Sequence, residues 1–151
     1  HFIGPIQSNK TKAIAENFQW VHSIDRLKIA QRLSGQRESS AAKLNVCVQV
    51  KISQEANKSG VELGEAEALC DSIEALPNIQ LRGLMAIPAA EPDPNSQRIA
   101  FRALAQEYFR LKPRYTQLDT LSMGMSNDFE AAIAEGSTLI RIGTGIFGPR
   151  S

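Results

Sequence analysis

The sequence lacks the features that mark membrane-spanning, secreted or nucleic-acid-binding chains. No apolar run is long enough to cross a bilayer, and the first residues show neither the basic n-region nor the apolar h-region of a secretory signal. The 17 lysines and arginines nearly balance the 16 aspartates and glutamates, so no excess charge favours a nucleic acid or a membrane surface. We therefore expect a soluble cytoplasmic protein with no nucleic-acid or membrane partner.

Cysteine and histidine are also scarce, with two residues of each. Cys47 and Cys70 fall in a predicted strand and a predicted helix, which favours two buried, reduced thiols over a disulfide or a metal site. His1 and His22 lie on predicted strands without the neighbours that a catalytic triad or a zinc site requires. We expect packing and hydrogen bonding from both histidines, and we predict no metal site.

The chain does contain a regular alternation of strands and helices. Apolar spacing predicts strands near positions 2, 22, 48, 84, 120 and 140, and helices over 7–18, 27–35, 63–76 and 96–112 and after position 128. This alternation indicates a parallel α/β architecture in one domain, residues 1–151. Six strands are two short of a closed (β/α)8 barrel. Ser23 or Asp25 is expected to cap the helix that follows position 26.

The clearest strand covers residues 44–53 and has two different faces. Its aliphatic face carries alternate residues that suit contact with helices: Val46, Val48, Val50 and Ile52. In a barrel its other face would point inward, and it carries Cys47, Gln49, Lys51 and Ser53. Lys51 is then expected to approach the mouth of a site at the carboxyl end of the sheet.

The stretch from Leu118 to Gly148 is the most informative part of the sequence. It is typical of a strand, a loop, a helix, a second strand and a glycine-rich loop. Ser126 follows the first of these strands, and Gly143, Thr144 and Gly145 follow the second. If the strands are parallel neighbours, both loops lie at one end of the sheet and can face one anion. In (β/α) barrels, the loops after the last two strands often form a phosphate site of this kind.

The run Gly143-Thr-Gly-Ile-Phe-Gly148 also satisfies the G-x-G-x-x-G pattern of dinucleotide-binding folds. Its context argues against a dinucleotide site, because almost no chain follows to form the receiving helix and no acidic residue can lie about 20 positions further on. A loop that binds a single phosphate remains, with a plain glycine turn as the alternative.

Arg141 shares the alternation of Leu139 and Gly143 on the last strand and is expected to approach the site. An arginine inside a sheet needs a carboxylate, a phosphate or a heterocycle as its partner. Spacing leaves open whether that partner is a ligand or an internal carboxylate such as Asp119 or Glu130. Asp128 and Glu130 open the next helix, where stabilisation of the helix dipole is the simpler explanation of their charge.

Several ordered motifs together resemble the pyridoxal-phosphate-binding homeostasis protein family. This family comprises bacterial YggS-like proteins and a eukaryotic member long called the proline synthetase co-transcribed homologue. The resemblance covers essentially the whole chain, and the motifs that carry it are His1-Phe-Ile-Gly-Pro-Ile-Gln-Ser-Asn-Lys10, Lys58-Ser-Gly60, Arg82-Gly-Leu-Met-Ala-Ile87, Leu121-Ser-Met-Gly-Met-Ser-Asn-Asp128 and Arg141-Ile-Gly-Thr-Gly-Ile-Phe-Gly148.

The resemblance implies a TIM-type (β/α)8 barrel, like the N-terminal domain of alanine racemase, with pyridoxal 5′-phosphate (PLP) at its carboxyl-end mouth. It implies that Ser126, Gly143 and Thr144 hold the phosphate and that Met125 belongs to the same site. It places Arg141 near the pyridine nitrogen, which would stay unprotonated and so weaken PLP as an electron sink. Family members are regarded as monomeric carriers or regulators of PLP without established catalytic turnover.

The family's Schiff-base lysine and a positioning asparagine lie on its first two barrel strands, which would precede His1. The sequence opens as if inside a strand, so we expect strands three to eight only, with open barrel edges through which the chain could self-associate. Lys51 stands where relatives are expected to have asparagine and could offer an amine.

Two enzymatic alternatives stay open. A PLP-dependent amino-acid racemase would need a second acid or base, commonly from another domain. A barrel enzyme acting on a phosphorylated sugar would use the same phosphate loops with a pair of catalytic carboxylates, and no convincing pair is evident.

Overall fold

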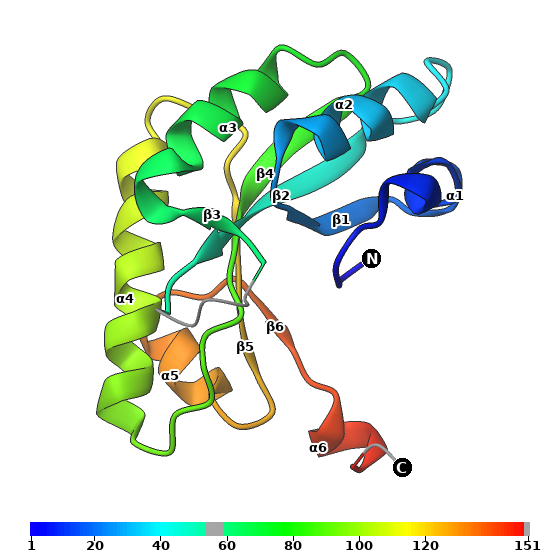
Figure 1. The fold of residues 1–151 in the computed structure, drawn as a ribbon. Coiled ribbons are helices and arrows are strands. Elements are labelled where there is room, and N and C mark those ends of the chain that lie inside the picture. Colours follow the sequence, from blue (N-terminus) through cyan, green and yellow to red (C-terminus); the bar gives the residue numbers. More distant parts are fainter. Residues whose placement is uncertain (54–58, 150–151) are drawn as a thin grey trace.

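The computed structural model describes residues 1–53 and 59–149 of the chain, and it contains a curved parallel sheet with helices along one side (Figure 1). The strands are β1 (Trp20–Ile24), β2 (Leu44–Lys51), β3 (Val61–Glu62), β4 (Ile79–Met85), β5 (Thr120–Met125) and β6 (Leu139–Arg141). The helices are α1 (Thr11–Asn17), α2 (Leu27–Gln36), α3 (Ala66–Glu74), α4 (Pro94–Leu111), α5 (Phe129–Ala134) and α6 (Thr144–Phe147), with 3-10 turns η1 (Ser8–Lys10) and η2 (Leu63–Glu65).

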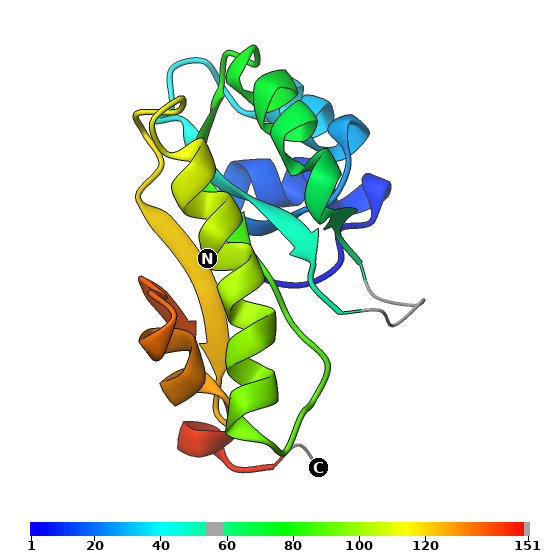
Figure 2. The ribbon, with the colours of Figure 1, turned by 90° about the vertical axis from the view of Figure 1, so that its left-hand side faces the viewer.

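The strand order identifies the type of winding. Neighbouring strands follow the order β1-β2-β4-β5-β6, every pair is parallel, and the short β3 pairs with β2. A doubly wound sheet reverses its strand order at a switch point, whereas a barrel adds each new strand beside the last one. The order is therefore that of an incomplete (β/α) barrel, as the sequence predicted, with the long α4 running beside the sheet (Figure 2).

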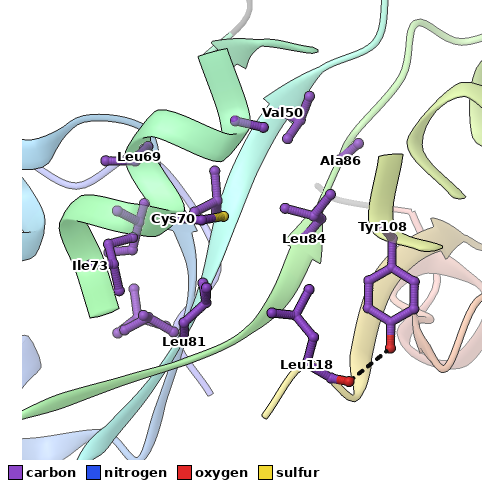
Figure 3. Packing of buried hydrophobic residues seen from close by; sticks show 14 of the residues in the cluster. Val50, Leu69, Cys70, Ile73, Leu81, Leu84, Ala86, Tyr108 and Leu118 are labelled. Carbon is purple, nitrogen blue, oxygen red and sulfur yellow. Dashed lines mark hydrogen bonds between the residues drawn. The ribbon is translucent and has the colours of Figure 1, made fainter. Parts of the chain in front are cut away.

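The core lies between the sheet and its helices. Figure 3 shows Val50, Leu81 and Leu84 of the strands packed against Leu69, Cys70 and Ile73 of α3. Tyr108 of α4 is buried at the same layer and donates its hydroxyl to the carbonyl oxygen of Leu118 at 3.4 Å (Figure 3). Each fully buried aliphatic side chain contributes roughly 1.5–3 kcal/mol, so this layer holds the helices against the sheet.

The aliphatic face predicted for β2 is confirmed, because Val46, Val48 and Val50 are all buried in that core. Cys47 and Cys70 are buried too, and burial raises the pKa of each thiol to about 12, which leaves both protonated at neutral pH. No helix among the described residues is long and apolar enough to span a membrane, and none of their histidines, cysteines or carboxylates gather in a group of three that could hold a metal ion.

Several predicted element boundaries were wrong. The strand predicted near position 2 is only a bridge between Phe2 and Val21, because Gly4 turns the chain with a φ of 139° and Pro5 has no N–H to extend a ladder. The helix predicted over 7–18 begins as η1 and is α-helical only from Thr11. The helix predicted over 63–76 likewise begins as η2, before α3. β3 and α6 were missed, since elements of two and four residues carry no readable periodicity.

The predicted cap of α2 was also wrong. Its N-cap position is Arg26, which makes no side-chain capping bond, while Asp25 accepts from the Arg26 guanidinium at 2.6 Å and Ser23 donates to the Gly4 carbonyl at 2.6 Å. A true cap occurs at α4, where the Asp93 carboxylate accepts from the Ser96 N–H at 2.8 Å. This cap explains why α4 begins two residues before the predicted start. Lys58 of the motif ending at Gly60 lies outside the described residues.

Candidate functional site

The loops after β5 and β6 lie side by side because these strands are parallel neighbours. Ser122 pairs with Leu139 and Met125 with Arg141, so the two strands end at the same edge of the sheet. Ser126 Oγ then accepts a hydrogen bond from the Gly145 N–H at 3.0 Å, which ties the first loop to the second. The geometric premise of a shared anion-binding edge is therefore met.

The loop after β5 is held in a tight turn by Asp128. Its carboxylate accepts from the Met125 N–H at 2.6 Å, and its own N–H donates to the Met125 carbonyl at 3.1 Å. The side chain makes no capping bond to α5, so a local turn, rather than the helix dipole alone, explains this carboxylate. Gly124, at a φ of 98°, precedes the turn, and a Cβ there would lie 2.7 Å from the Cβ of Ala132. Only glycine fits this position.

The loop after β6 presents free backbone donors. Ile146 and Phe147 both donate their N–H groups to the Gly143 carbonyl, at 3.0 and 2.9 Å, which forms the single turn of α6. Within the described part of the chain, the N–H groups of Gly143 and Thr144 donate no hydrogen bond. Two unused N–H groups beside the Ser126 hydroxyl form a set of neutral donors suited to an anion.

One cavity of about 1070 Å³ opens at this edge. The five residues that the family resemblance assigned to the cofactor site all line it: Met125, Ser126, Arg141, Gly143 and Thr144. Sequence reasoning missed the contribution of the loop between β4 and α4, which supplies Ile87, Pro88, Ala90, Glu91 and Pro92. The available signal was position, because this loop also follows the carboxyl end of a parallel strand.

Arg141 is held at two nitrogens and unpartnered at the third. Its Nη1 donates to Ser122 Oγ at 2.7 Å and its Nη2 to the carbonyl oxygen of Ala86 at 3.0 Å. Its Nε is buried without a hydrogen-bond partner among the described residues. A buried donor left unpaired costs about 1–3 kcal/mol, a cost that a ligand in the cavity would remove.

The internal ion pair considered for Arg141 is not the one that forms. Asp119 instead receives a forked pair of hydrogen bonds from Arg82, one of them from Nε at 3.1 Å. Burial lowers the pKa of the Arg141 guanidinium, an effect that the nearby Asp128 carboxylate opposes. Among the described residues, no carboxylate lies within 4.0 Å of Arg141, Glu130 included.

The two histidines continue the contacts of Arg141 across the inner side of the sheet. His22 Nδ1 lies 2.8 Å from Ser122 Oγ, and His22 Nε2 lies 2.9 Å from His1 Nδ1. Burial, reinforced by the charge of Arg141, lowers the pKa of His22 to about 4, so its imidazole is neutral at pH 7. The predicted role of both histidines in packing and hydrogen bonding is confirmed.

Lys51 does not lie where the sequence predicted. Its Nζ pairs with a carboxylate oxygen of Glu62 at 3.3 Å, and it lines a separate hollow of about 420 Å³ that includes Ala103 of α4. The cause is β3, which the sequence did not reveal and which sets Glu62 beside the end of β2. Lys51 is therefore no part of the large cavity.

Comparison with known proteins shows which family the sequence matches. A family model described as "Alanine racemase, N-terminal domain" matches residues 1–151. The pyridoxal phosphate homeostasis protein of Pseudomonas aeruginosa is 57% identical over 150 residues, which are 99% of this chain and 64% of that protein. The chain thus spans slightly less than two thirds of the length of this relative.

Solved structures of a related protein superpose closely on this chain. PipY of Synechococcus elongatus PCC7942, without PLP, superposes with a TM-score of 0.89 at 34% identity, over 98% of this chain and 70% of that one. The structure of the same protein with PLP bound gives a TM-score of 0.86 at 33% identity, over 98% and 69%. At this level of identity and coverage, the likeness extends to family as well as fold.

Proposed function

The chain belongs to the alanine racemase N-terminal domain family, and from this premise we propose that residues 1–151 are one domain, part of a barrel that binds PLP in a homeostasis protein. The single observation that carries the proposal is the unpartnered Nε of Arg141 at the wall of a cavity that is also lined by Ser126 and by Gly143 and Thr144 with their free N–H groups. A relative with a solved PLP complex supports the choice of ligand.

The loop donors suit the phosphate group of PLP. The Ser126 hydroxyl and the N–H groups of Gly143 and Thr144 can each donate to a phosphate oxygen, and hydrogen bonds to an ionised group are about twice as strong as neutral ones. Gly145 keeps this loop close to Ser126, because a Cβ there would lie 3.1 Å from Ile142 Cγ2 and 3.4 Å from Ser126 Oγ. Met125 completes the wall beside the phosphate loop.

Arg141 suits the pyridine ring of PLP. A guanidinium donates hydrogen bonds and accepts none, so a ring nitrogen paired with its Nε–H has to be the acceptor and hence unprotonated. PLP supplies an electron sink for carbanion chemistry, and an unprotonated ring nitrogen weakens that sink. Arg141 therefore favours holding the cofactor over driving catalysis with it.

The described cavity wall supports a carrier or regulator rather than an enzyme. Its ionisable side chains among the described residues are Glu91, Asp128 and Arg141, and Asp128 is engaged by the Met125 N–H. This part of the wall contains no imidazole or amine to move a proton to or from a substrate. We therefore favour non-catalytic PLP binding over racemisation, and we place the function in PLP homeostasis.

Pyridoxine 5′-phosphate tests the proposal, because it has the ring and phosphate of PLP but no aldehyde and so needs no lysine. We expect saturable one-to-one binding by calorimetry, with inorganic phosphate as a competitor. Ser126→Ala should weaken binding about 10–100-fold, since a hydrogen bond to a charged group contributes roughly 1.5–3 kcal/mol. Ser126→Thr should recover much of the loss. Ser72→Ala on α3, whose hydroxyl donates to the Ala68 carbonyl at 2.9 Å, is the matched control.

Unchanged affinity in Ser126→Ala would contradict the assignment of the phosphate loop. PLP added with borohydride, followed by mass spectrometry, separates the covalent and non-covalent cases: a trapped adduct would identify a reacting lysine within these residues. Racemisation of an amino acid by the PLP-loaded chain would contradict the non-catalytic assignment.

A further inference from the structure

A series of hydrogen bonds reaches Arg141 from the opposite edge of the sheet. It runs from Arg141 on β6 to Ser122 on β5, then to His22 on β1 and on to His1, with separations of 2.7, 2.8 and 2.9 Å. Ser122 and His22 are both buried and lie 100 residues apart in the sequence. Neither lines the cavity, so the binding site as described does not account for them.

The donors and acceptors in this series fix its direction. Arg141 can only donate, so Ser122 Oγ has to accept from Nη1. The single hydroxyl proton of Ser122 is then free to donate to His22 Nδ1. When Ser122 donates, His22 Nδ1 accepts, which places the imidazole proton on Nε2, where it donates to His1 Nδ1. In this order each of the three contacts has one donor and one acceptor, and the hydroxyl proton of Ser122 is used.

The reverse order leaves a proton unused. If His22 carried its proton on Nδ1, Ser122 Oγ would accept from both sides, and its hydroxyl proton would have no acceptor among the described residues. Protonation of both ring nitrogens has the same consequence and adds a second cation beside Arg141. Both arrangements weaken the hold of Ser122 on the guanidinium.

We propose that Ser122 and His22 are positioning residues for Arg141: the Nε2–H tautomer of His22 orients the Ser122 hydroxyl, which holds Nη1 and leaves Nε as the donor for a pyridine nitrogen in the cavity. This inference rests on the proposed function for the identity of the ligand. The Ala86 carbonyl fixes Nη2, and two fixed nitrogens define the plane of a rigid guanidinium, so Nε is directed without a contact of its own.

The tautomer is testable without any ligand. Nitrogen-15 chemical shifts of His22 in the full chain should show a bare Nδ1 and a protonated Nε2 at pH 7. The Arg141 Nε–H should give one sharp resonance that broadens in Ser122→Ala and in His22→Leu. A protonated Nδ1 in His22, or an Arg141 signal that neither substitution changes, would overturn the proposal.

The second readout is the absorption spectrum of bound pyridoxine 5′-phosphate, which reports whether its ring nitrogen is protonated. The wild-type chain should hold this nitrogen unprotonated at pH 7, and Ser122→Ala and His22→Leu should raise its apparent pKa by about one unit, a tenfold change in the protonation equilibrium. His22→Asn keeps a side-chain oxygen near the position of Nδ1 and should restore the wild-type spectrum.

Thr120→Val is the matched control, because it removes another hydroxyl of β5. This hydroxyl donates to Asp119 at 2.8 Å and takes no part in the hydrogen bonds that link Arg141 to His1. A merely structural role for Ser122 and His22 would weaken binding without moving the spectrum, and that result would overturn the proposal. If pyridoxine 5′-phosphate does not bind the wild-type chain, the proposed function fails, and the Arg141 Nε–H resonance still decides whether Ser122 and His22 hold the guanidinium.

Discussion

Two arginines on the inner side of the sheet, Arg82 and Arg141, are held in opposite ways. Arg82 on β4 forms a forked ion pair with Asp119, donates to Asn45 Oδ1 at 2.7 Å, and stacks over the Trp20 ring at 4.7 Å from its centroid. Arg141 on β6 has no carboxylate partner among the described residues and retains a buried, unpaired Nε. Every nitrogen of Arg82 therefore has a partner in the protein, whereas one nitrogen of Arg141 has none among the described residues.

The difference separates a structural arginine from a binding arginine. All three nitrogens of Arg82 donate to the protein and its guanidinium stacks on an aromatic face, so its contribution is to join β1, β2 and β4 to Asp119, the residue before β5. A guanidinium held by one hydroxyl and one carbonyl keeps both its charge and a donor for something else. The two residues are of the same type, and only their hydrogen-bond and ion-pair partners distinguish them.

The largest loss of stability is expected from a substitution that separates β4 from β5, because the partners of both arginines depend on the pairing of these strands. Gly83 on β4 faces Thr120 on β5, and a methyl group at Gly83 would overlap the Thr120 carbonyl. Gly83→Ala should force the strands apart and destabilise the chain by more than about 4 kcal/mol, or prevent folding. Arg82 would separate from Asp119, and Arg141 from Ser122 or Ala86. Urea unfolding followed by circular dichroism measures the loss.

Gly35→Ala on α2 is the control for this substitution, since nothing lies within 4 Å of an added Cβ there. It should leave stability unchanged or raise it by up to about 1 kcal/mol, because alanine favours the helix. A Gly83→Ala chain as stable as the wild type would contradict the close approach of β4 and β5.

The next prediction compares the replacement of each arginine by leucine. Arg141→Leu should weaken binding of pyridoxine 5′-phosphate about 10–100-fold, through loss of one charge-assisted hydrogen bond, and change unfolding free energy by less than about 1 kcal/mol. Arg82→Leu should leave binding unchanged and reduce stability by roughly 1–2 kcal/mol, since Asp119 is half exposed and the ion pair is partly screened. Calorimetry and urea unfolding measure the two quantities.

Equal loss of binding in both variants would contradict the division between a structural and a binding arginine. If Arg141→Leu lost stability but kept its binding, Arg141 would be the structural arginine, and the proposed division would be reversed. Arg141→Lys adds a finer test, because lysine keeps the charge but not the fixed fork of donors, and should recover little of the affinity.

The sequence could predict the fold wherever apolar and polar side chains alternate with a regular period over several residues. β2 was predicted correctly because Val46, Val48 and Val50 alternate with polar residues over eight positions. β3 was not, because two residues carry no period, and missing it misplaced Lys51. The cap of α4 at Asp93 was readable from Asp-Pro, whereas α2 simply begins without a side-chain cap.

The site was partly predictable because parallel strands bring their following loops together. Ser126, Gly143 and Thr144 do line one cavity, and their binding of a phosphate stays a prediction. The partner of Arg141 could not be predicted, because Asp119 had the right charge and only the register of β4 with β5 assigns it to Arg82. No spacing along the chain could link Ser122 to His22, which β1 and β5 bring together across the curve of the sheet.

The smallest expected effect separates the two arginines by pH. Burial alone would raise the pKa of Asp119, but its hydrogen bonds from Arg82 and Thr120 outweigh burial and lower it. A lowered folded pKa contributes stability that is present above the unfolded value of about 3.9 and is lost as pH falls through the folded pKa. Asp119→Asn should therefore flatten the loss of stability below about pH 4, by less than about 1 kcal/mol because Asp119 is half exposed.

The region of Arg141 should respond in a different pH window. Burial lowers the pKa of His22 to about 4 in the folded chain from about 6.5 when unfolded, so stability falls as pH drops from 6.5 towards 4. The charge of Arg141 adds to that shift, after burial, so Arg141→Leu should flatten this window and leave the one below pH 4 unchanged. Urea midpoints at pH 3, 5 and 7 for wild type, Asp119→Asn and Arg141→Leu measure both windows. If both variants flattened the same window, the two arginines would belong to one electrostatic unit, and their separate roles would have no basis.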